Sequence, residues 1–427
     1  MDRLLGFPPA LLDQRTRRNF SLDALSALLV GVFAAIINPF AQVVAIRLGA
    51  PNSAIGLIAA APYLGALTSF YWGRISHDRA KLPFVVWPNL IGRSFLLWAA
   101  FTRDPWVYAI VILLYNIIVA IPGPAYSGLM EKVYPAAFRG RLMAAIRVLM
   151  GVSFAAVSYF AGEALDRFGH GVLFPIGVAF GTASILVFSR LSEPARPLDG
   201  ARPPEGRPDG PGPAGYRGPD RDSGGFIAVL RSDRLFLTYL IGFMVFGTAN
   251  LFVAPLYPVF QVRVLHLTYS QVAVISLVWS VAWLIAYRVW GWVADRLRPA
   301  VVLIASVLGY ALASLIYSRA HSLGSLLLAA TLIGQADAGM DLGWLAEVMR
   351  LAGDRTSTYF GLHLTLMGLR GTIAPFIGTS LLSVFPIRRL FVVGGLVILI
   401  GLIPFIIAER VSAAASSRSV EREIGSI

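Results

Sequence analysis

NPFAQVV (residues 38–44) and YPVFQVR (residues 257–263) are two stretches of one chain that carry proline and glutamine at the same spacing. The shared residues are offset by 219 positions. A single match of this kind could be chance. The similarity becomes informative when other pairs of residues recur at the same offset.

Two further similarities recur at nearly this offset. FYWGRISHDR (residues 70–79) resembles RVWGWVADR (residues 288–296), with the Trp-Gly pair offset by 218 positions, and Gly162 pairs with Gly378 at an offset of 216. Self-similarity at one fixed offset is typical of a duplicated structural unit. The 427-residue chain is therefore predicted to contain two copies of one unit.

The composition indicates what kind of unit this is. With 57% hydrophobic and 14% charged residues, the chain is more apolar than a soluble domain of ordinary composition. A membrane-spanning helix needs about 20 mostly apolar residues. The sequence thus predicts an all-α integral membrane protein with twelve transmembrane helices, at about 24–47, 53–74, 84–101, 106–130, 142–163, 171–190, 236–260, 271–292, 300–319, 324–349, 357–384 and 390–409.

A stretch rich in Pro, Gly and Arg separates the two sets of six segments. Such a composition cannot bury enough apolar surface to fold, so it predicts a flexible linker. The expected domains are an N-terminal six-helix bundle at 1–190, the linker at 191–232, a C-terminal six-helix bundle at 233–410 and a tail at 411–427.

The distribution of positive charge predicts the orientation. Most Lys and Arg residues fall in loops on one side of the predicted membrane, which the positive-inside rule assigns to the cytoplasm. Both termini, the linker and the tail are then cytoplasmic, in an inner or plasma membrane. The net charge of +13 is explained by anionic lipid at that face and needs no nucleic acid partner.

A turn with the pattern GxxxDR follows the eighth apolar segment, at Gly291, Asp295 and Arg296. In the first copy Gly73 is followed by Asp78 and Arg79. There His77 occupies the position expected for the aspartate. A glycine permits close approach of a neighbouring helix, and an acidic residue can accept hydrogen bonds from a helix N-terminus. These residues are predicted to form a gate at the cytoplasmic side; the alternative is that they are ordinary loop charges that set topology.

The duplicated set of six segments, the long central linker and the GxxxDR turn resemble the major facilitator superfamily of secondary transporters. AIRLGAPNSAIGLIAAAPYLGALTS (residues 45–69) and GLHLTLMGLRGTIAPFIGTSLL (residues 361–382) are similar to poorly characterised bacterial, efflux-like members. The resemblance implies two pseudo-symmetric six-helix bundles, alternating access and a monomer. It implies no cofactor.

Two aspartates one helical turn apart lie in the predicted tenth span. Asp337 falls about 20 Å along that helix, close to the bilayer middle, and Asp341 shares its face. A charged carboxylate in lipid costs several kcal/mol, so this face is expected to look into the bundle or an aqueous cavity. Two carboxylates this close resist joint ionisation, which would let one exchange a proton. Alternatively, both only hydrogen-bond neighbouring helices or pair permanently with an arginine.

Other polar residues within the spans are candidates to act with them. His363 and Arg370 lie on the eleventh span, and Arg147 on the fifth corresponds to His363 by the repeat offset. Arg93 on the third span is equally consistent with a structural role. The side chains expected to line the cavity are Asn38, Gln42, Gln261 and Gln335. Helix breakers are expected to bend two spans, at Pro122, Gly123 and Pro124 in the fourth and at Pro375 and Gly378 in the eleventh.

The sequence favours a secondary transporter for a small amphipathic or charged solute, coupled to a proton or another ion, with efflux slightly preferred. The fourth span lacks the arginine and the fifth the Gly-Pro motif of many drug and proton antiporters, which leaves an uptake symporter or a uniporter open. A lipid enzyme lacks a nucleophile cluster, since the chain has no cysteine. A metal carrier built on Asp337, Asp341 and His363 would have a single histidine, so we expect no metal site.

Overall fold

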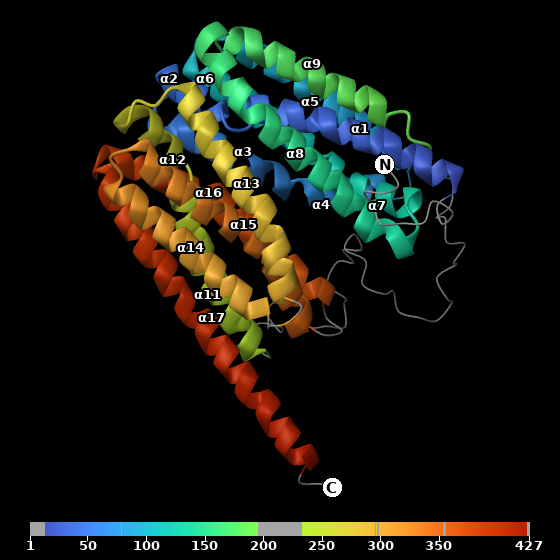
Figure 1. The fold of residues 1–427 in the computed structure, drawn as a ribbon, viewed down its shortest axis with the longest axis vertical. Coiled ribbons are helices and arrows are strands. Elements are labelled where there is room, and N and C mark those ends of the chain that lie inside the picture. The colour runs from blue at the N-terminus through green and yellow to red at the C-terminus, as the bar shows by residue number, and fades with distance from the viewer. Residues whose placement is uncertain are drawn as a thin grey trace. The chain divides into compact units, whose positions relative to one another are not determined.

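The computed structural model describes residues 13–194 except 78, and residues 233–424 except 295, 297–298 and 353–355. It is drawn in Figure 1. Helices account for nearly all of these residues, and no strand occurs among them. Most of the predicted linker, together with Asp78 and Asp295 of the predicted gate, lies outside the described residues.

The first half begins at an N-cap, where the Asp13 side chain accepts a hydrogen bond from the Thr16 amide at 3.0 Å. Asp104 caps another helix in the same way and is followed by proline at the first helical position, where a missing N–H costs nothing. The helices of this half are α1 (Gln14–Ile37), α2 (Ala41–Arg47), α3 (Asn52–Leu67), α4 (Ser69–Ser76), α5 (Lys81–Phe101), α6 (Pro105–Ala120), α7 (Pro122–Val133), α8 (Ala136–Phe168) and α9 (His170–Phe188).

The second half also begins at an aspartate N-cap, with the Phe236 amide donating to Asp233 at 2.9 Å. Its elements are α11 (Arg234–Val253), α12 (Leu256–Val259), the π-helical turn η2 (Phe260–Val264), α13 (Tyr269–Ala294), α14 (Pro299–Arg319), α15 (Leu323–Ala352), α16 (Thr356–Ser380), the 3₁₀ turn η4 (Leu381–Ser383) and α17 (Ile387–Ile424). The last helix therefore continues into the segment predicted to be a tail.

The described residues contain 11 helical segments long and apolar enough to cross a membrane, and one shorter apolar helix, Asn52–Leu67. The shorter helix continues through Thr68 into α4, which gives it the length of a span. The predicted twelve transmembrane helices are confirmed.

The first helix of each half is interrupted close to the repeated proline motif. α1 ends at Ile37 and α2 begins at Ala41, while α11 ends at Val253 and α12 begins at Leu256. Proline lacks the amide hydrogen that an uninterrupted helix needs, and the first break contains Pro39 while the second contains Pro255. The repeated Pro258 lies inside α12, so the second break comes slightly earlier than the repeat of the motif would place it. The expected break in the fourth span is present as well, between α6 and α7. Pro375, in contrast, lies inside an unbroken α16.

The same packing scheme occurs in both halves. In the first, α1 packs against α8 and α9, and α5 packs against α6 and α9. In the second, α11 packs against α16 and α17, and α14 packs against α15 and α17. These pairs correspond one to one under the repeat, which confirms the pseudo-symmetry. Figure 1 shows the first set with α1, α8 and α9 side by side.

Close helix contacts depend on glycine at two of these interfaces. A Cβ at Gly31 on α1 would clash with the Met150 carbonyl of α8, and a Cβ at Gly378 on α16 would clash with the Phe252 carbonyl of α11. Small residues let helix backbones approach closely where lipid provides no hydrophobic driving force. The first helix of each half is therefore held by a glycine contact to the fifth helix of its set.

The chain divides into two compact units. One holds the described residues of α1 to α9 together with residues 261–280, and the other holds residues 233–260 and those from 281 onward. Residues 261–280 include η2 and the first half of α13, so the boundary between units falls inside α13 rather than at the predicted linker alone.

Candidate functional site

The two aspartates of α15 each accept a hydrogen bond from a tyrosine on a neighbouring helix. The Tyr310 hydroxyl of α14 donates to Asp337 Oδ1, and the Tyr287 hydroxyl of α13 donates to Asp341 Oδ2 at 2.9 Å. Asp337 is half-buried and Asp341 is exposed. The carboxylates lie one turn apart on α15, as predicted, but they have different tyrosine partners.

Small residues around Asp337 allow α15 to pack closely on α14. Ala336 and Ala338 are fully buried. A Cβ at Gly309 of α14 would clash with the Gln335 amide, so that glycine makes room for Gln335. The Gln335 carbonyl in turn accepts a hydrogen bond from the Trp290 indole at 2.8 Å. The carboxylates thus sit on a rigid, well-packed stretch of helix.

His363 lies in an aromatic pocket on α16. Its ring stacks on Trp344 with centroids 4.8 Å apart and an angle of 12°, and meets the edge of Phe243 at 4.3 Å. The side chain is only 2% exposed, and Nδ1 has no hydrogen-bond partner among the described residues. A buried polar nitrogen without a partner is costly, which marks this imidazole as a candidate for function.

Arg370 lies near His363, two turns further along α16. Its guanidinium donates to the Phe243 carbonyl and lies over the Phe243 ring at 5.0 Å. A Cβ at Gly247 would clash with the guanidinium, so this glycine provides its space. Phe243 also contacts Phe246, which contacts Tyr310. An aromatic chain therefore connects the predicted His363 and Arg370 with the tyrosine that binds Asp337.

The predicted residues of the first half are less enclosed. Arg147 on α8 and Asn38 at the helix break are exposed, and Gln42 on α2 is half-buried. Gln261 is buried, and its backbone carbonyl accepts a hydrogen bond from the Leu267 amide at 2.9 Å.

Arg93 has the surroundings of a structural residue. It is buried on α5, donates to the Gly181 carbonyl and to the Ser184 hydroxyl at 2.8 Å, and lies over the Phe33 ring at 4.8 Å. These contacts join α5 to α9 and α1. They use the guanidinium to satisfy backbone and aromatic groups inside one bundle.

The described residues of the predicted gate make few contacts. A Cβ at Gly73 would touch Pro124 at 3.7 Å, and one at Gly291 would meet nothing within 4 Å, so packing does not require either glycine. Arg296 lies over the Trp292 ring at 4.0 Å, and Arg79 is exposed. Asp78 and Asp295 lie outside the described residues.

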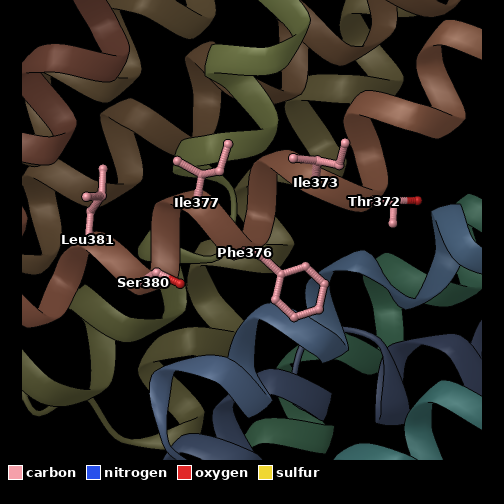
Figure 2. Close-up of a pocket in the computed structure, with 6 residues that line it drawn as sticks. All are labelled: Thr372, Ile373, Phe376, Ile377, Ser380 and Leu381. Atoms are coloured by element: carbon pink, nitrogen blue, oxygen red, sulfur yellow. The ribbon is translucent and has the colours of Figure 1, made fainter.

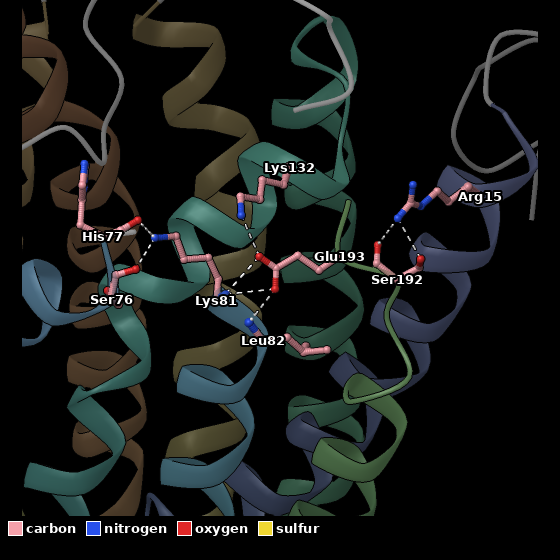
Figure 3. Close-up of polar contacts among 8 residues, drawn as sticks. All are labelled: Arg15, Ser76, His77, Lys81, Leu82, Lys132, Ser192 and Glu193. Carbon is pink, nitrogen blue, oxygen red and sulfur yellow. Dashed lines mark hydrogen bonds and ion pairs between the residues drawn. The ribbon is translucent and has the colours of Figure 1, made fainter. Parts of the chain in front are cut away.

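Sequence reasoning missed Glu193, which the domain prediction assigned to the linker. Figure 3 shows its carboxylate accepting hydrogen bonds from the Lys81 and Leu82 amides at 3.0 Å and from the Lys132 ammonium at 2.9 Å. The Lys81 ammonium donates to the carbonyls of Ser76 and His77. The loop between α4 and α5 is therefore held by Glu193, in the segment that follows α9.

The surroundings of Glu193 favour its charged form. Burial raises the pKa of Glu193, but the hydrogen bonds from the Leu82 amide and Lys132 outweigh it and hold the pKa below its ordinary value. The signal that could have revealed this role is the start of α5, where Ala80 cannot cap a helix and another side chain must do so.

Asp23 is a second residue that sequence analysis passed over. It lies on α1, one residue before the predicted start of the first span. Its Oδ2 accepts a hydrogen bond from the Tyr134 hydroxyl at 2.8 Å, and the residue is 3% exposed. An acidic residue next to a long apolar segment was the available signal.

A polar cluster joins α8 to the start of α13 within the first unit. Asp166 accepts hydrogen bonds from the amides of Tyr269 and Ser270 at 2.9 and 2.8 Å, so it satisfies two free amides in the first turn of α13. Arg47 lies 4.0 Å from the same carboxylate. Arg263 donates to the Ala50 carbonyl at 2.7 Å. These contacts explain why the first half of α13 groups with α1 to α9.

A hollow of about 450 Å³ runs along α16, and Figure 2 draws the residues that line it. It is lined by Thr372, Ile373, Phe376, Ile377, Ser380 and Leu381. Its lining is mostly apolar and contains none of the predicted polar residues. Among the described residues, no group of three or more His, Cys, Asp or Glu side chains is arranged to hold a metal ion.

The structure resembles solved transporters of low sequence identity. The nucleoside transporter NupG has a TM-score of 0.67 at 13% identity, with 93% of this chain and 99% of that chain covered. A bacterial homologue of the human lysosomal transporter Spinster, in an inward-facing and unoccupied conformation, has a TM-score of 0.64 at 14% identity, with 93% and 98% covered. At these identities the likeness establishes the fold alone.

Sequence comparison identifies the family. A search among proteins of curated function finds no significant match. The sequence profile of the Major Facilitator Superfamily matches residues 24–301 and again residues 254–425, which together span nearly the whole chain. The repeated six-helix scheme, the twelve spans and this match agree, and the chain belongs to the Major Facilitator Superfamily of membrane transporters.

Proposed function

We propose that this transporter couples a small amphipathic or charged solute to a proton by alternating access, and that it exports the solute from the cytoplasm. Asp337 is the residue that takes up and releases the proton. Asp341, which is exposed, is the carboxylate that meets a polar or positively charged group of the solute. Both termini lie in the cytoplasm in this proposal.

The pairing of each carboxylate with a tyrosine carries the proposal. A tyrosine hydroxyl can donate to a carboxylate or accept from a protonated carboxyl group, so it satisfies both protonation states. The Asp337 and Tyr310 pair therefore allows a proton to come and go without leaving a polar group unsatisfied. A lysine or arginine in the place of Tyr310 would instead favour the charged form.

His363 and Arg370 support the proposal from the same unit. A buried cation at Arg370 and an imidazole with one unpartnered nitrogen give the second bundle groups that can respond to a charge change at Asp337. The aromatic chain through Phe243 and Phe246 makes that response mechanical as well as electrostatic.

Uptake by symport, or uniport, is the second candidate. It is favoured by the absence of arginine from α6 and α7 and of proline from α8, where many drug and proton antiporters have these residues. In a symporter the solute and the proton would bind together, so solute binding would draw a proton in rather than displace it.

The test is proton release from purified protein in weakly buffered detergent, read with a pH-indicator dye as solutes are added. The solutes are a lipophilic organic cation, an organic anion and a nucleoside. The variants are Asp337→Asn and Asp341→Asn. Asp104→Asn is the matched control, because Asp104 is an exposed helix cap and asparagine caps equally well.

Release by the parent and the control that is abolished in Asp337→Asn supports antiport through this carboxylate. Proton uptake in place of release supports symport. Solute binding with no proton movement in any variant overturns proton coupling and leaves a uniporter or a carrier coupled to another ion.

A further inference from the structure

Each half of the chain contains one aspartate near the start of its first helix that pairs with a buried tyrosine. In the first half the Tyr134 hydroxyl donates to Asp23 at 2.8 Å. In the second half the Tyr359 hydroxyl donates to Asp233 at 2.7 Å. Both tyrosines are fully buried; Tyr134 lies between α7 and α8, and Tyr359 lies in the first turn of α16.

The two aspartates differ in what else they do. Asp233 is the N-cap of α11, is partly exposed, and uses its other oxygen to accept a hydrogen bond from the Phe236 amide. Asp23 lies nine residues inside α1, where every backbone amide is already used by the helix, and is 3% exposed. Capping therefore explains Asp233 and does not explain Asp23.

Asp23 is surrounded by apolar side chains. Phe20, Ala24 and Ala27 of its own helix belong to one buried cluster with Tyr134. The other members of that cluster come from α5, α7, α8 and α9 and the residues that follow them: Val85, Ala125, Leu129, Met130, Val133, Leu142, Ile146, Phe188 and Leu191. Asp23 forms no ion pair among the described residues.

The titratable groups that face Asp23 can be named helix by helix. From α7 and the turn after it come Tyr126 and Tyr134. From α8 come Arg147, which is exposed and acts on Tyr126, and Arg139, which donates to the carbonyls of Glu131 and Tyr134. The cluster residues from α9 and its end are Phe188 and Leu191, which have no titratable group. The phenols of Tyr126 and Tyr134 are neutral at physiological pH. None of these groups provides the buried counter-charge that an ionised Asp23 would need.

We propose that Asp23 is a second proton-binding site of the transporter, and that its protonation controls the contact between α1 and the turn that joins α7 to α8. The protonated carboxyl group fits the apolar cluster with its single tyrosine partner. When the proton leaves for water, the carboxylate requires hydration, so the contact around Tyr134 loosens. The only bond that changes is the O–H bond of the Asp23 carboxyl group, and a proton from water restores it.

The proposal rests on the proposed proton coupling but places a proton in the other bundle from Asp337. Proton exchange at Asp23 would change the packing of α1, which is the helix broken at residues 38–40. A change at one end of α1 could then reach the break without any contact between the two carboxylates.

The direct test is infrared difference spectroscopy of the purified, reconstituted protein during a pH titration. A protonated carboxylic acid has a carbonyl band that an ionised one lacks. We expect a band that disappears with rising pH in the parent, is missing in Asp23→Asn, and remains in the matched control Asp233→Asn. If Asp23→Asn gives the parent spectrum, or if its band does not titrate while the protein is folded, the proposal is wrong.

A second variant distinguishes loss of the proton site from misfolding of the protein. Tyr134→Phe keeps the carboxylate and removes its hydrogen-bond donor, so it should shift the frequency of the band, whereas Tyr359→Phe should not. Hydrogen exchange of peptides that contain Tyr134, compared between the parent and Asp23→Asn at each pH, reads out the contact. Exchange should rise with pH in the parent more than in Asp23→Asn, and equal exchange overturns the conformational part.

The two proposals fail separately. If neither aspartate variant of α15 loses solute-driven proton release while the Asp23 band still titrates, the proposed role of Asp337 is wrong and the Asp23 site stands. If the Asp23 band does not titrate while proton release depends on Asp337, the Asp23 site is wrong and the proposed role of Asp337 stands.

Discussion

Asp166 accepts two hydrogen bonds from Ser270, one from the backbone amide at 2.8 Å and one from the hydroxyl at 2.6 Å. The two residues are more than 100 positions apart, on α8 and α13. A carboxylate at a helix N-terminus is favoured both by the free amides and by the helix dipole. The pair therefore ties the end of one predicted span to the beginning of another.

Weakening this pair should loosen the start of α13. The chain has no cysteine, so a single Val272→Cys substitution, at a position 3% exposed, gives one reporter thiol. Adding Asp166→Asn should accelerate alkylation of that thiol about tenfold, equivalent to about 1.4 kcal/mol. Asp166 accepts through both oxygens, whereas asparagine has one acceptor oxygen, no charge to interact with the helix dipole and no ion pair with Arg47. Glu163→Gln, an exposed change on the same helix, should have no effect. An unchanged alkylation rate in Asp166→Asn would contradict a latching role.

Gly378→Ala should destabilise the second bundle. A Cβ at this position would clash with the Phe252 carbonyl, and overpacking of a helix contact costs about 1–3 kcal/mol. The midpoint of thermal unfolding in detergent, taken at one heating rate, should fall. Gly291→Ala is the control, since a Cβ there meets no atom within 4 Å, and its midpoint should stay at the parent value. Equal midpoints for the two variants would show that α16 can move away from α11.

Glu193→Gln should lower stability at neutral pH and lose that effect in acid. The pKa of Glu193 lies below its ordinary value, so its contribution is complete above about pH 4.3, the ordinary glutamate value, and is lost as the pH falls through the lowered pKa. The unfolding midpoints of the parent and the variant should therefore converge at low pH. Glu163→Gln should match the parent throughout. A gap that persists in acid would mean that size or packing, rather than charge, explains the effect.

His363→Phe separates stability from function. Phenylalanine keeps an aromatic ring between Trp344 and Phe243 and removes the unpartnered Nδ1, so the unfolding midpoint should rise, with a gain of about 1 kcal/mol. Solute-driven proton movement should nevertheless fall if the imidazole acts in transport. His170→Phe, at a half-buried histidine beside Phe174, is the control. If the variant is more stable and fully active, His363 serves only in packing.

Apolar segments and their repetition were enough to predict the membrane class, the twelve spans and the two sets of six. The pair NPFAQVV and YPVFQVR was used only as evidence of duplication, and the breaks beside both stretches were found in the structure, because proline acts locally. Pro122 was predicted correctly for the same reason. Pro375 was expected to bend α16 and does not break it, since packing around a proline decides whether a helix is interrupted.

The site was harder to predict because its partners are distant in sequence. Spacing placed Asp337 and Asp341 on one helix, but nothing in the sequence indicated that Tyr310 and Tyr287 would bind them. Glu193 was missed because its neighbours resemble a linker, while its partners are the amides at the start of α5. Asp23 was missed because a single acidic residue near a span edge resembles an ordinary boundary residue until Tyr134 is placed beside it.

The broken first helix of each half also indicates when the break arose. The interruption at residues 38–40 and the one at residues 254–255 both lie next to the repeated proline motif, although the second comes slightly earlier in its copy. A bend that both copies share is most simply inherited from the single gene that was duplicated. The ancestral six-helix protein then already possessed a jointed first helix, before there was a second bundle for it to move against.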